Sequence, residues 1–183
     1  MKRRAALAVS LTLLAGGALA QSPQPYAGLQ SRAIKALSAE QIADLTAGRG
    51  MSFALPAELN GYPGPIHVIE LADQLALTGD QRTRLQALFE QMRQEAIGIG
   101  HRLIAQEGEL DRLFSDRKIT AASLAVSTAA IGQTQAALRA THLRYHLLTA
   151  DILTPAQIQR YAELRGYAGD PKSMPHHPSR HHR

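Results

Sequence analysis

The sequence of 183 residues contains no cysteine. Disulfide bonds, thiolate metal sites and cysteine nucleophiles are therefore excluded, and so is a lipid anchor attached to cysteine. The fold must be stable without covalent cross-links. A chain of this length is long enough for one domain with its own hydrophobic core.

Signals for β-strands and for the common catalytic motifs are also missing. No stretch shows the alternation of β-branched residues that predicts a strand. There is no glycine-rich phosphate loop, no nucleophile elbow and no His-Glu-x-x-His motif. Carboxylates such as Glu107 and Glu109 have the spacing of ordinary charges on a helix face. We therefore predict an all-α protein that is not an enzyme.

The formal net charge of +5 comes from the two ends of the chain. Residues 1–20 hold three basic groups, and residues 168–183 hold three basic groups and one acid. Between them, residues 21–167 carry 14 basic and 14 acidic residues. A neutral central region does not favour nucleic acid as a partner.

The first twenty residues have the pattern of a secretory signal peptide. Lys2, Arg3 and Arg4 precede an apolar stretch, and Ala18-Leu19-Ala20 forms a cleavage site of small residues. We expect cleavage after Ala20 and, in a Gram-negative bacterium, a periplasmic location; an uncleaved anchor is the alternative. No later segment approaches the roughly 20 apolar residues of a membrane span.

A short phrase occurs three times, at residues 37–41, 77–81 and 153–157. In each copy a hydroxyl residue precedes a glutamine by three positions, which is the spacing of a capping box at a helix N-terminus. The second and third copies read Leu-Thr-x-x-Gln and comprise Leu77, Thr78, Gln81, Leu153, Thr154 and Gln157. An apolar residue suited to a hydrophobic staple follows the first and third copies, as Ile42 and Ile158, whereas Arg82 follows the second.

Apolar residues spaced three or four apart predict two long amphipathic helices, Gly79 to Phe114 and Thr120 to Ile152. Shorter helices are expected after the first capping box, over Ile66 to Leu75, and from Pro155 to about Arg165. Residues 46–64 are rich in glycine and proline and have no period, which indicates a functional or flexible loop. We expect residues 21–36 and 168–183 to be disordered.

With two Leu-Thr-x-x-Gln motifs separated by long helices and preceded by a signal peptide, the chain resembles the Spy/CpxP family of periplasmic proteins. This family overlaps with the periplasmic heavy-metal-resistance and metal-sensor group. The resemblance covers about residues 64–167 and implies a four-helix protomer that is often paired into an antiparallel homodimer. The chain adds an N-terminal extension, residues 21–63, with a short helix, and a histidine-rich tail, residues 168–183.

The resemblance also implies ATP-independent binding of unfolded or aggregation-prone clients in the envelope stress response. A heavy-metal-binding sensor or resistance protein is the alternative, and an adaptor for the periplasmic domain of a sensor kinase is a third. Long helices that leave an apolar stripe exposed could bind clients directly, flanked by the apolar stems of arginines. The candidates are Arg82, Arg93, Arg102, Arg112, Arg139 and Arg144. Ordinary ion pairs with nearby acids are the alternative interpretation of these arginines.

Histidines support the metal hypothesis, although no cofactor is required by the sequence. His142 and His146 lie four apart on one helix face, where neutral imidazoles can bind Ni²⁺, Cu²⁺ or Zn²⁺. His67, Glu70 or His101 would have to complete such a site. A looser chelator is the tail, with His176, His177, His181 and His182.

Overall fold

The computed structural model describes residues 24 and 26–167, and this part of the chain is all-helical, as predicted. It contains no β-strand. Its α-helices are α1 (Ala39–Ala47), α2 (Leu55–Glu58), α3 (Pro65–Glu70), α4 (Gly79–Ser115), α5 (Ala121–Ile152) and α6 (Pro155–Leu164). None of these helices combines the length and hydrophobicity that crossing a bilayer requires. The predicted signal peptide and histidine-rich tail lie outside the described residues.

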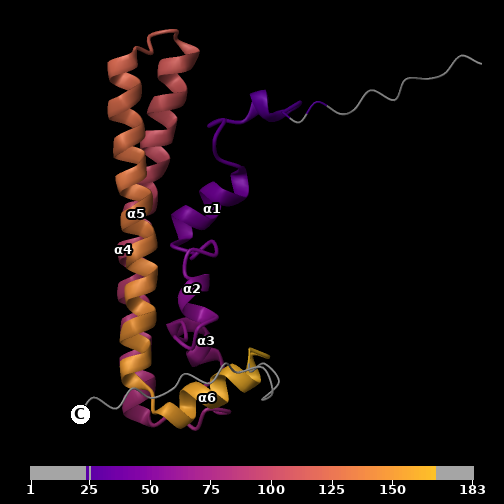
Figure 1. Ribbon diagram of the computed structural model, residues 1–183, viewed down its shortest axis with the longest axis vertical. Helices are drawn as coiled ribbons and strands as arrows, with labels where there is room; N and C mark the ends of the chain where they lie inside the picture. Colours follow the sequence, from indigo (N-terminus) through magenta and orange to yellow (C-terminus); the bar gives the residue numbers. More distant parts are fainter. Residues whose placement is uncertain (1–23, 25, 168–183) are drawn as a thin grey trace, which may run out of the picture.

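Helices α4 and α5 form a long antiparallel pair that runs the whole length of the molecule (Figure 1). Their bounds agree with the predicted helices to within one residue. A short turn joins them, and Thr120 then caps α5 through a capping box with Ser123. The predicted apolar stripes meet between the two helices, where Leu85, Leu103 and Leu138 are almost completely buried.

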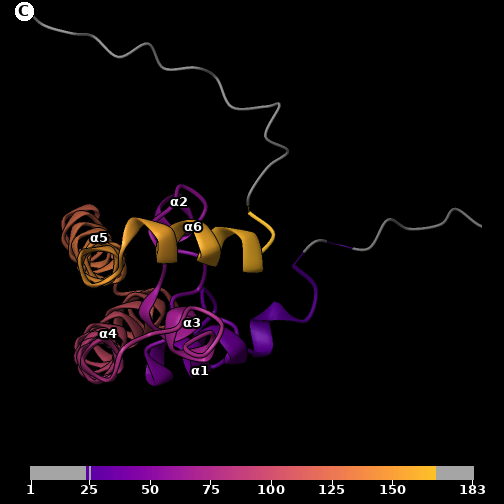
Figure 2. The same cartoon turned by 90° about the horizontal axis from the view of Figure 1, so that it is seen from below.

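The other helices all lie on one side of the α4–α5 pair (Figures 1 and 2). α1 and α3 pack against α4, and α2 packs against α5. α6 leaves the end of α5 and crosses the base of the molecule, as Figure 2 shows from below. The opposite side of the pair therefore has no covering element within the described residues.

Helix α1 approaches α4 closely at Gly100. A Cβ atom at this position would lie 2.4 Å from the carbonyl oxygen of Leu45, so only glycine fits without a backbone shift. Gly48 ends α1 with a left-handed φ of 71°, and a Cβ there would lie 2.8 Å from the carbonyl oxygen of Arg93. A glycine in a helix interior costs about 1 kcal/mol relative to alanine, and at Gly100 the close packing of α1 offsets that cost.

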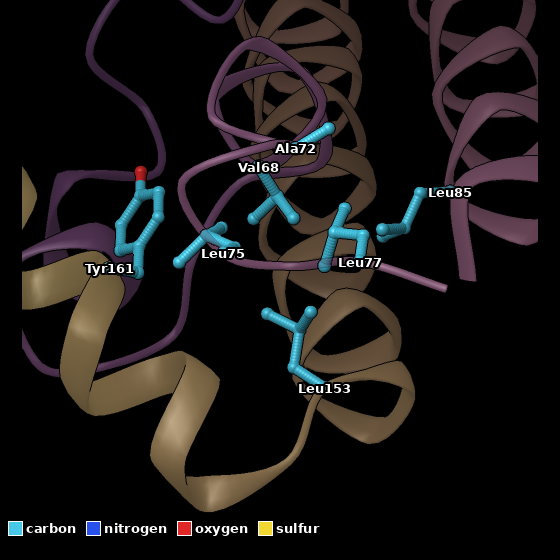
Figure 3. Close-up of a cluster of buried hydrophobic side chains, with 7 residues drawn as sticks. All are labelled: Val68, Ala72, Leu75, Leu77, Leu85, Leu153 and Tyr161. Carbon is cyan, nitrogen blue, oxygen red and sulfur yellow. The ribbon is translucent and has the colours of Figure 1, made fainter. Parts of the chain in front are cut away.

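Two hydrophobic clusters hold these elements together. The cluster at the base, shown in Figure 3, joins α3, α4, α5 and α6 through Val68, Ala72, Leu75, Leu77, Leu85, Leu153 and Tyr161. The second cluster lies higher between α1, α4 and α5 and contains Leu37, Leu45, Ala96, Leu103, Ile131 and Leu138. Burial of a leucine-sized side chain contributes about 1.5–3 kcal/mol, so these clusters are the main source of stability.

Three expectations for the N-terminal part need correction. Residues 26–36 were expected to be disordered, yet Ile34 packs near Gly108 and Lys35 pairs with Asp111 at 3.3 Å. The irregular stretch from 46 to 64 contains the single-turn helix α2, which periodicity cannot detect because it has only four residues. The helix expected from Ile66 to Leu75 ends at Glu70 and continues as turns.

Candidate functional site

The two Leu-Thr-x-x-Gln motifs meet at the base of the molecule. All three predicted capping boxes form, with the side chains of Ser38, Thr78 and Thr154 accepting from the backbone N–H three residues later. Beyond this, Gln81 Nε2 donates to Gln157 Oε1 at 2.9 Å, and Gln157 Nε2 donates to Gln81 Oε1 at 3.1 Å. We call this reciprocal amide pair the glutamine clasp.

Every hydrogen-bonding position of the glutamine clasp is used. Each Oε1 also accepts from the N–H of its own capping threonine, at 3.1 Å for Thr78 and 2.9 Å for Thr154. Each Nε2 also donates to a backbone carbonyl, Gln81 to Ile152 and Gln157 to Leu75. An amide that makes all four of its bonds has no free group to offer a ligand. The geometry therefore gives the motif a structural role.

Arg82 replaces the missing hydrophobic staple of the second motif. Its Nε donates to the carbonyl of Leu77 at 3.2 Å, and its guanidinium also donates to Asp73 at 2.8 Å. In the first and third motifs the staple partners share a cluster: Ile42 packs against the cluster of Leu37, and Ile158 against that of Leu153.

The uncovered side of the α4–α5 pair, which we call the open face, has two hollows. The hollow near the base has a volume of about 420 Å³ and is lined by Arg84, Ala87, Leu88, Gln91, Leu148, Asp151 and Ile152. The hollow near the turn has a volume of about 310 Å³ and is lined by Arg102, Ala105, Gln106, Glu109, Val126, Ser127 and Ala130. Val126 and Leu148 are 71% and 38% exposed. Gly98 lies between the hollows on α4, and a Cβ there would meet no atom within 4 Å.

The structure does not gather the six candidate arginines on one surface. Arg102 lines the hollow near the turn, whereas Arg82 lies on the side of α3. Arg93, Arg112 and Arg144 pair with Glu90, Glu109 and Glu95, and Arg112 also pairs with Asp116. Within residues 24 and 26–167, Arg102 and Arg139 have no ion-pair partner. Arg84 lines the base hollow and was not among the candidates, because its spacing gives no sign of which side it faces.

A separate cavity of about 300 Å³ lies between α2, α3, α4 and α5, and we call it the His142 cavity. His142 and His146 both line it, as expected from their spacing on α5. His142 is only 3% exposed, and its Nε2 has no hydrogen-bond partner in the described part of the protein. Burial, with a smaller contribution from His146, lowers the pKa of His142, so its imidazole is neutral at pH 7.

His146 and Glu58 belong to a network that joins three helices and a loop. His146 Nδ1 lies 2.6 Å from the carbonyl oxygen of Tyr62 and 3.7 Å from Glu58 Oε2. The buried Glu58 carboxylate accepts hydrogen bonds from the N–H of Gly64, at 3.0 Å, and from the hydroxyl of Tyr161. Burial and the bond to Glu58 raise the pKa of Tyr161, which keeps its hydroxyl a donor. The network compensates the buried charge of Glu58.

The other proposed donors do not complete a site with the two histidines. His67 lines the His142 cavity, but its Nδ1 lies 3.1 Å from Glu70. His101 is exposed on α4 and does not line the cavity. In the described part of the chain no three His, Asp or Glu side chains are placed to hold a metal ion together. The tail histidines lie outside that part.

Sequence reasoning missed three side chains of the cavity wall: Met51, Met92 and Glu58. Met92 belongs to the apolar stripe of α4 and was assigned to the core, whereas Met51 lies in the stretch without a period. A carboxylate at Glu58, placed among Leu, Ala and Pro residues, was the available sign of a buried charge.

A scan against models of protein families finds no match to the chain, and searches of curated proteins and of solved structures find no match either. The function is therefore argued from the geometry of the open face and of the His142 cavity.

Proposed function

We propose that the protein is an exported, chaperone-like protein of the Spy/CpxP kind that binds unfolded or aggregation-prone polypeptides on its open face without nucleotide. The observation that carries this proposal is the absence, in the described part of the chain, of any element covering that side of the α4–α5 pair. Exposed apolar side chains on such a surface bind the apolar side chains of other proteins.

The chemistry of the two hollows supports broad client selection. Each hollow is within the usual size range of small-ligand sites, about 300–1,000 Å³, and has exposed carbon atoms at its rim. Each contains one basic and one acidic residue: Arg84 with Asp151, and Arg102 with Glu109. The open face therefore does not select clients by the sign of their charge. Binding should persist at physiological salt, where exposed charges are screened over about 8 Å.

The test is suppression of aggregation of a chemically denatured protein, followed by light scattering without nucleotide. Val126→Gln combined with Leu148→Gln removes the two exposed apolar side chains of the hollows. Leu59→Gln combined with Tyr62→Gln is the matched control, because these residues are 56% and 43% exposed but lie on and after α2. We expect the wild type and the control to suppress aggregation at several-fold molar excess, and the open-face variant to lose most of this activity. Equal suppression by both variants, or none by the wild type, would refute the proposal.

A second copy of the chain is the competing occupant of the open face. Arg102 near the turn and Asp151 near the base have no ion-pair partner in the described part of the protein. An antiparallel pair of copies would bring Arg102 of each copy toward Asp151 of the other. If sedimentation shows a dimer that Arg102→Glu dissociates and Arg102→Glu with Asp151→Arg restores, the open face is a dimer interface and clients do not bind there. A homodimer through another surface is compatible with client binding.

A further inference from the structure

The His142 cavity contains a buried polar group that the fold itself does not satisfy. Buried nitrogen atoms without a hydrogen-bond partner are rare, and each costs about 1–3 kcal/mol. His142 Nε2 is such an atom. Because His142 is neutral, one of its ring nitrogens carries a lone pair and the other a proton. A ligand in the cavity would give Nε2 the partner that it lacks.

His146 is held in the tautomer that a metal ion requires. A backbone carbonyl can only accept a hydrogen bond, so the 2.6 Å contact with Tyr62 means that Nδ1 carries the proton. The lone pair of His146 is therefore on Nε2, which is close to Gly64: a Cβ at Gly64 would lie 3.1 Å from this atom. A histidine that binds a metal through one nitrogen normally donates the other N–H to a carbonyl or carboxylate, as His146 does.

Two thioethers complete the wall of the same cavity. Met92 comes from α4 and Met51 from the loop before α2, and both line the cavity beside the two histidines. Met51 and the following Ser52 have left-handed φ angles of 44° and 66°, an arrangement that costs about 1–2 kcal/mol per residue outside glycine. The chain thus places Met51 in the wall at an energetic cost. Ser52 and Leu55, at the rim, are exposed and leave a path to solvent.

We propose that the His142 cavity binds one soft monovalent metal ion, Cu(I), through Nε2 of His142 and the thioether sulfurs of Met51 and Met92, with Nε2 of His146 as a further ligand. Thioether ligands select Cu(I), and neutral imidazole also suits copper. This site is separate from the open face and is independent of client binding.

The donor set argues against the divalent metals that the sequence suggested for His142 and His146. Mg²⁺, Ca²⁺ and Mn²⁺ prefer oxygen ligands, and Zn²⁺ is usually bound by several nitrogen, thiolate or carboxylate ligands. No such group of three His, Asp or Glu side chains exists among residues 24 and 26–167. The one carboxylate in the wall, Glu58, is already engaged by Gly64 and Tyr161. Thioethers are the remaining donors that could complete coordination.

The test is an anaerobic titration of the full chain with Cu(I), held reduced by ascorbate, in competition with a coloured Cu(I) chelator. His176, His177, His181 and His182 are changed to alanine in every sample, so that the tail does not contribute. We expect one tight site per chain. Met51→Leu, Met92→Leu and His142→Phe should each weaken it by about tenfold or more, whereas His101→Gln, on an exposed histidine of α4, should not. Circular dichroism of each variant checks that the helices are retained.

X-ray absorption of the Cu(I)-loaded protein gives a readout that depends on no cavity variant. Sulfur scattering together with histidine scattering is the expected result. A first shell of nitrogen and oxygen alone would overturn the proposal. Equal Cu(I) affinity in the parent chain and in the two methionine variants would overturn it as well, and so would the absence of a tight site. Zn²⁺ binding that is lost in the methionine variants would replace Cu(I) as the metal.

Discussion

Gln81 and Gln157 hydrogen-bond to each other in both directions, although 76 residues separate them in the sequence. Each of these glutamines also completes the capping box of its own helix. The glutamine clasp therefore joins the start of α4 to the start of α6, and it explains physically why the same motif occurs twice. One copy alone would cap a helix but leave half of each amide without a partner.

A double-mutant cycle tests the glutamine clasp. Gln81→Ala and Gln157→Ala should each cost about 1–3 kcal/mol, because each leaves a part-buried amide of the other glutamine unsatisfied. The double variant should cost less than the sum of the two, with an interaction energy of about 0.5–3 kcal/mol. Chemical denaturation measures these values. Gln41→Ala is the control, since Gln41 caps α1 in the same way but has no clasp partner; it should cost clearly less than either. Strict additivity of the pair would contradict the clasp.

The capping threonines give a second test. Thr78→Ala or Thr154→Ala should destabilise the protein by about 1 kcal/mol each through loss of the helix cap. Thr83→Ala, one turn into α4, should be close to neutral, because this exposed hydroxyl only donates back to Gly79. Thermal denaturation measures the three variants. Suppression of client aggregation should survive wherever the fold does. Loss of suppression with an unchanged melting curve would make the motif a contact site.

Two glycines of α4 should respond oppositely to alanine. Gly100→Ala should destabilise the protein by about 1–3 kcal/mol, because the new methyl group overlaps the carbonyl of Leu45. Gly98→Ala should stabilise it by up to about 1 kcal/mol through helix propensity, since nothing lies near its Cβ. Both values come from denaturation at low protein concentration. If Gly98→Ala destabilised the protein as Gly100→Ala does, the open face would be covered in solution.

Neighbouring carboxylates on α4 should show opposite pH dependence. Burial raises the pKa of Glu107, so the folded state holds its proton more tightly, and the stability that this group contributes is lost as pH rises above about 4.5. Glu107→Gln should therefore stabilise the protein more at pH 7 than at pH 4.5. The hydrogen bond from Arg112 lowers the pKa of Glu109, so its contribution is present above about 4.5 and is lost as pH falls. Glu109→Gln should accordingly weaken the protein at pH 7 and have little effect at low pH. Melting temperatures across this range give both signs, and identical profiles would contradict the argument.

Local patterns predicted the helices well, because capping and periodicity depend on residues three or four apart. The bounds of α4 and α5 and the capping boxes of α1, α4 and α6 follow from such patterns. The same patterns failed where a few long-range contacts decide. Ile34 and Lys35 are held against α4 by Gly108 and Asp111, and no local signal near Ile34 announces those partners.

The candidate sites were predicted less completely, because a site depends on which faces meet. Spacing placed His142 and His146 on one face, and the structure brings both to one cavity. It could not indicate that Met51, from a loop, would line the same cavity. Nor could it separate Arg102, on the open face, from Arg93 and Arg112, whose ion pairs with acids three residues away are ordinary surface contacts.

The arrangement of the base has a consequence for the order of folding. The α4–α5 pair closes through a short turn, and a short loop costs little chain entropy. The contacts of the base span far more of the chain: 76 residues for the glutamine clasp and 103 for the bond between Glu58 and Tyr161. Contacts between distant residues form slowly. We therefore expect the hairpin to assemble early, and the base to lock only after the ribosome has released the segment that contains Tyr161.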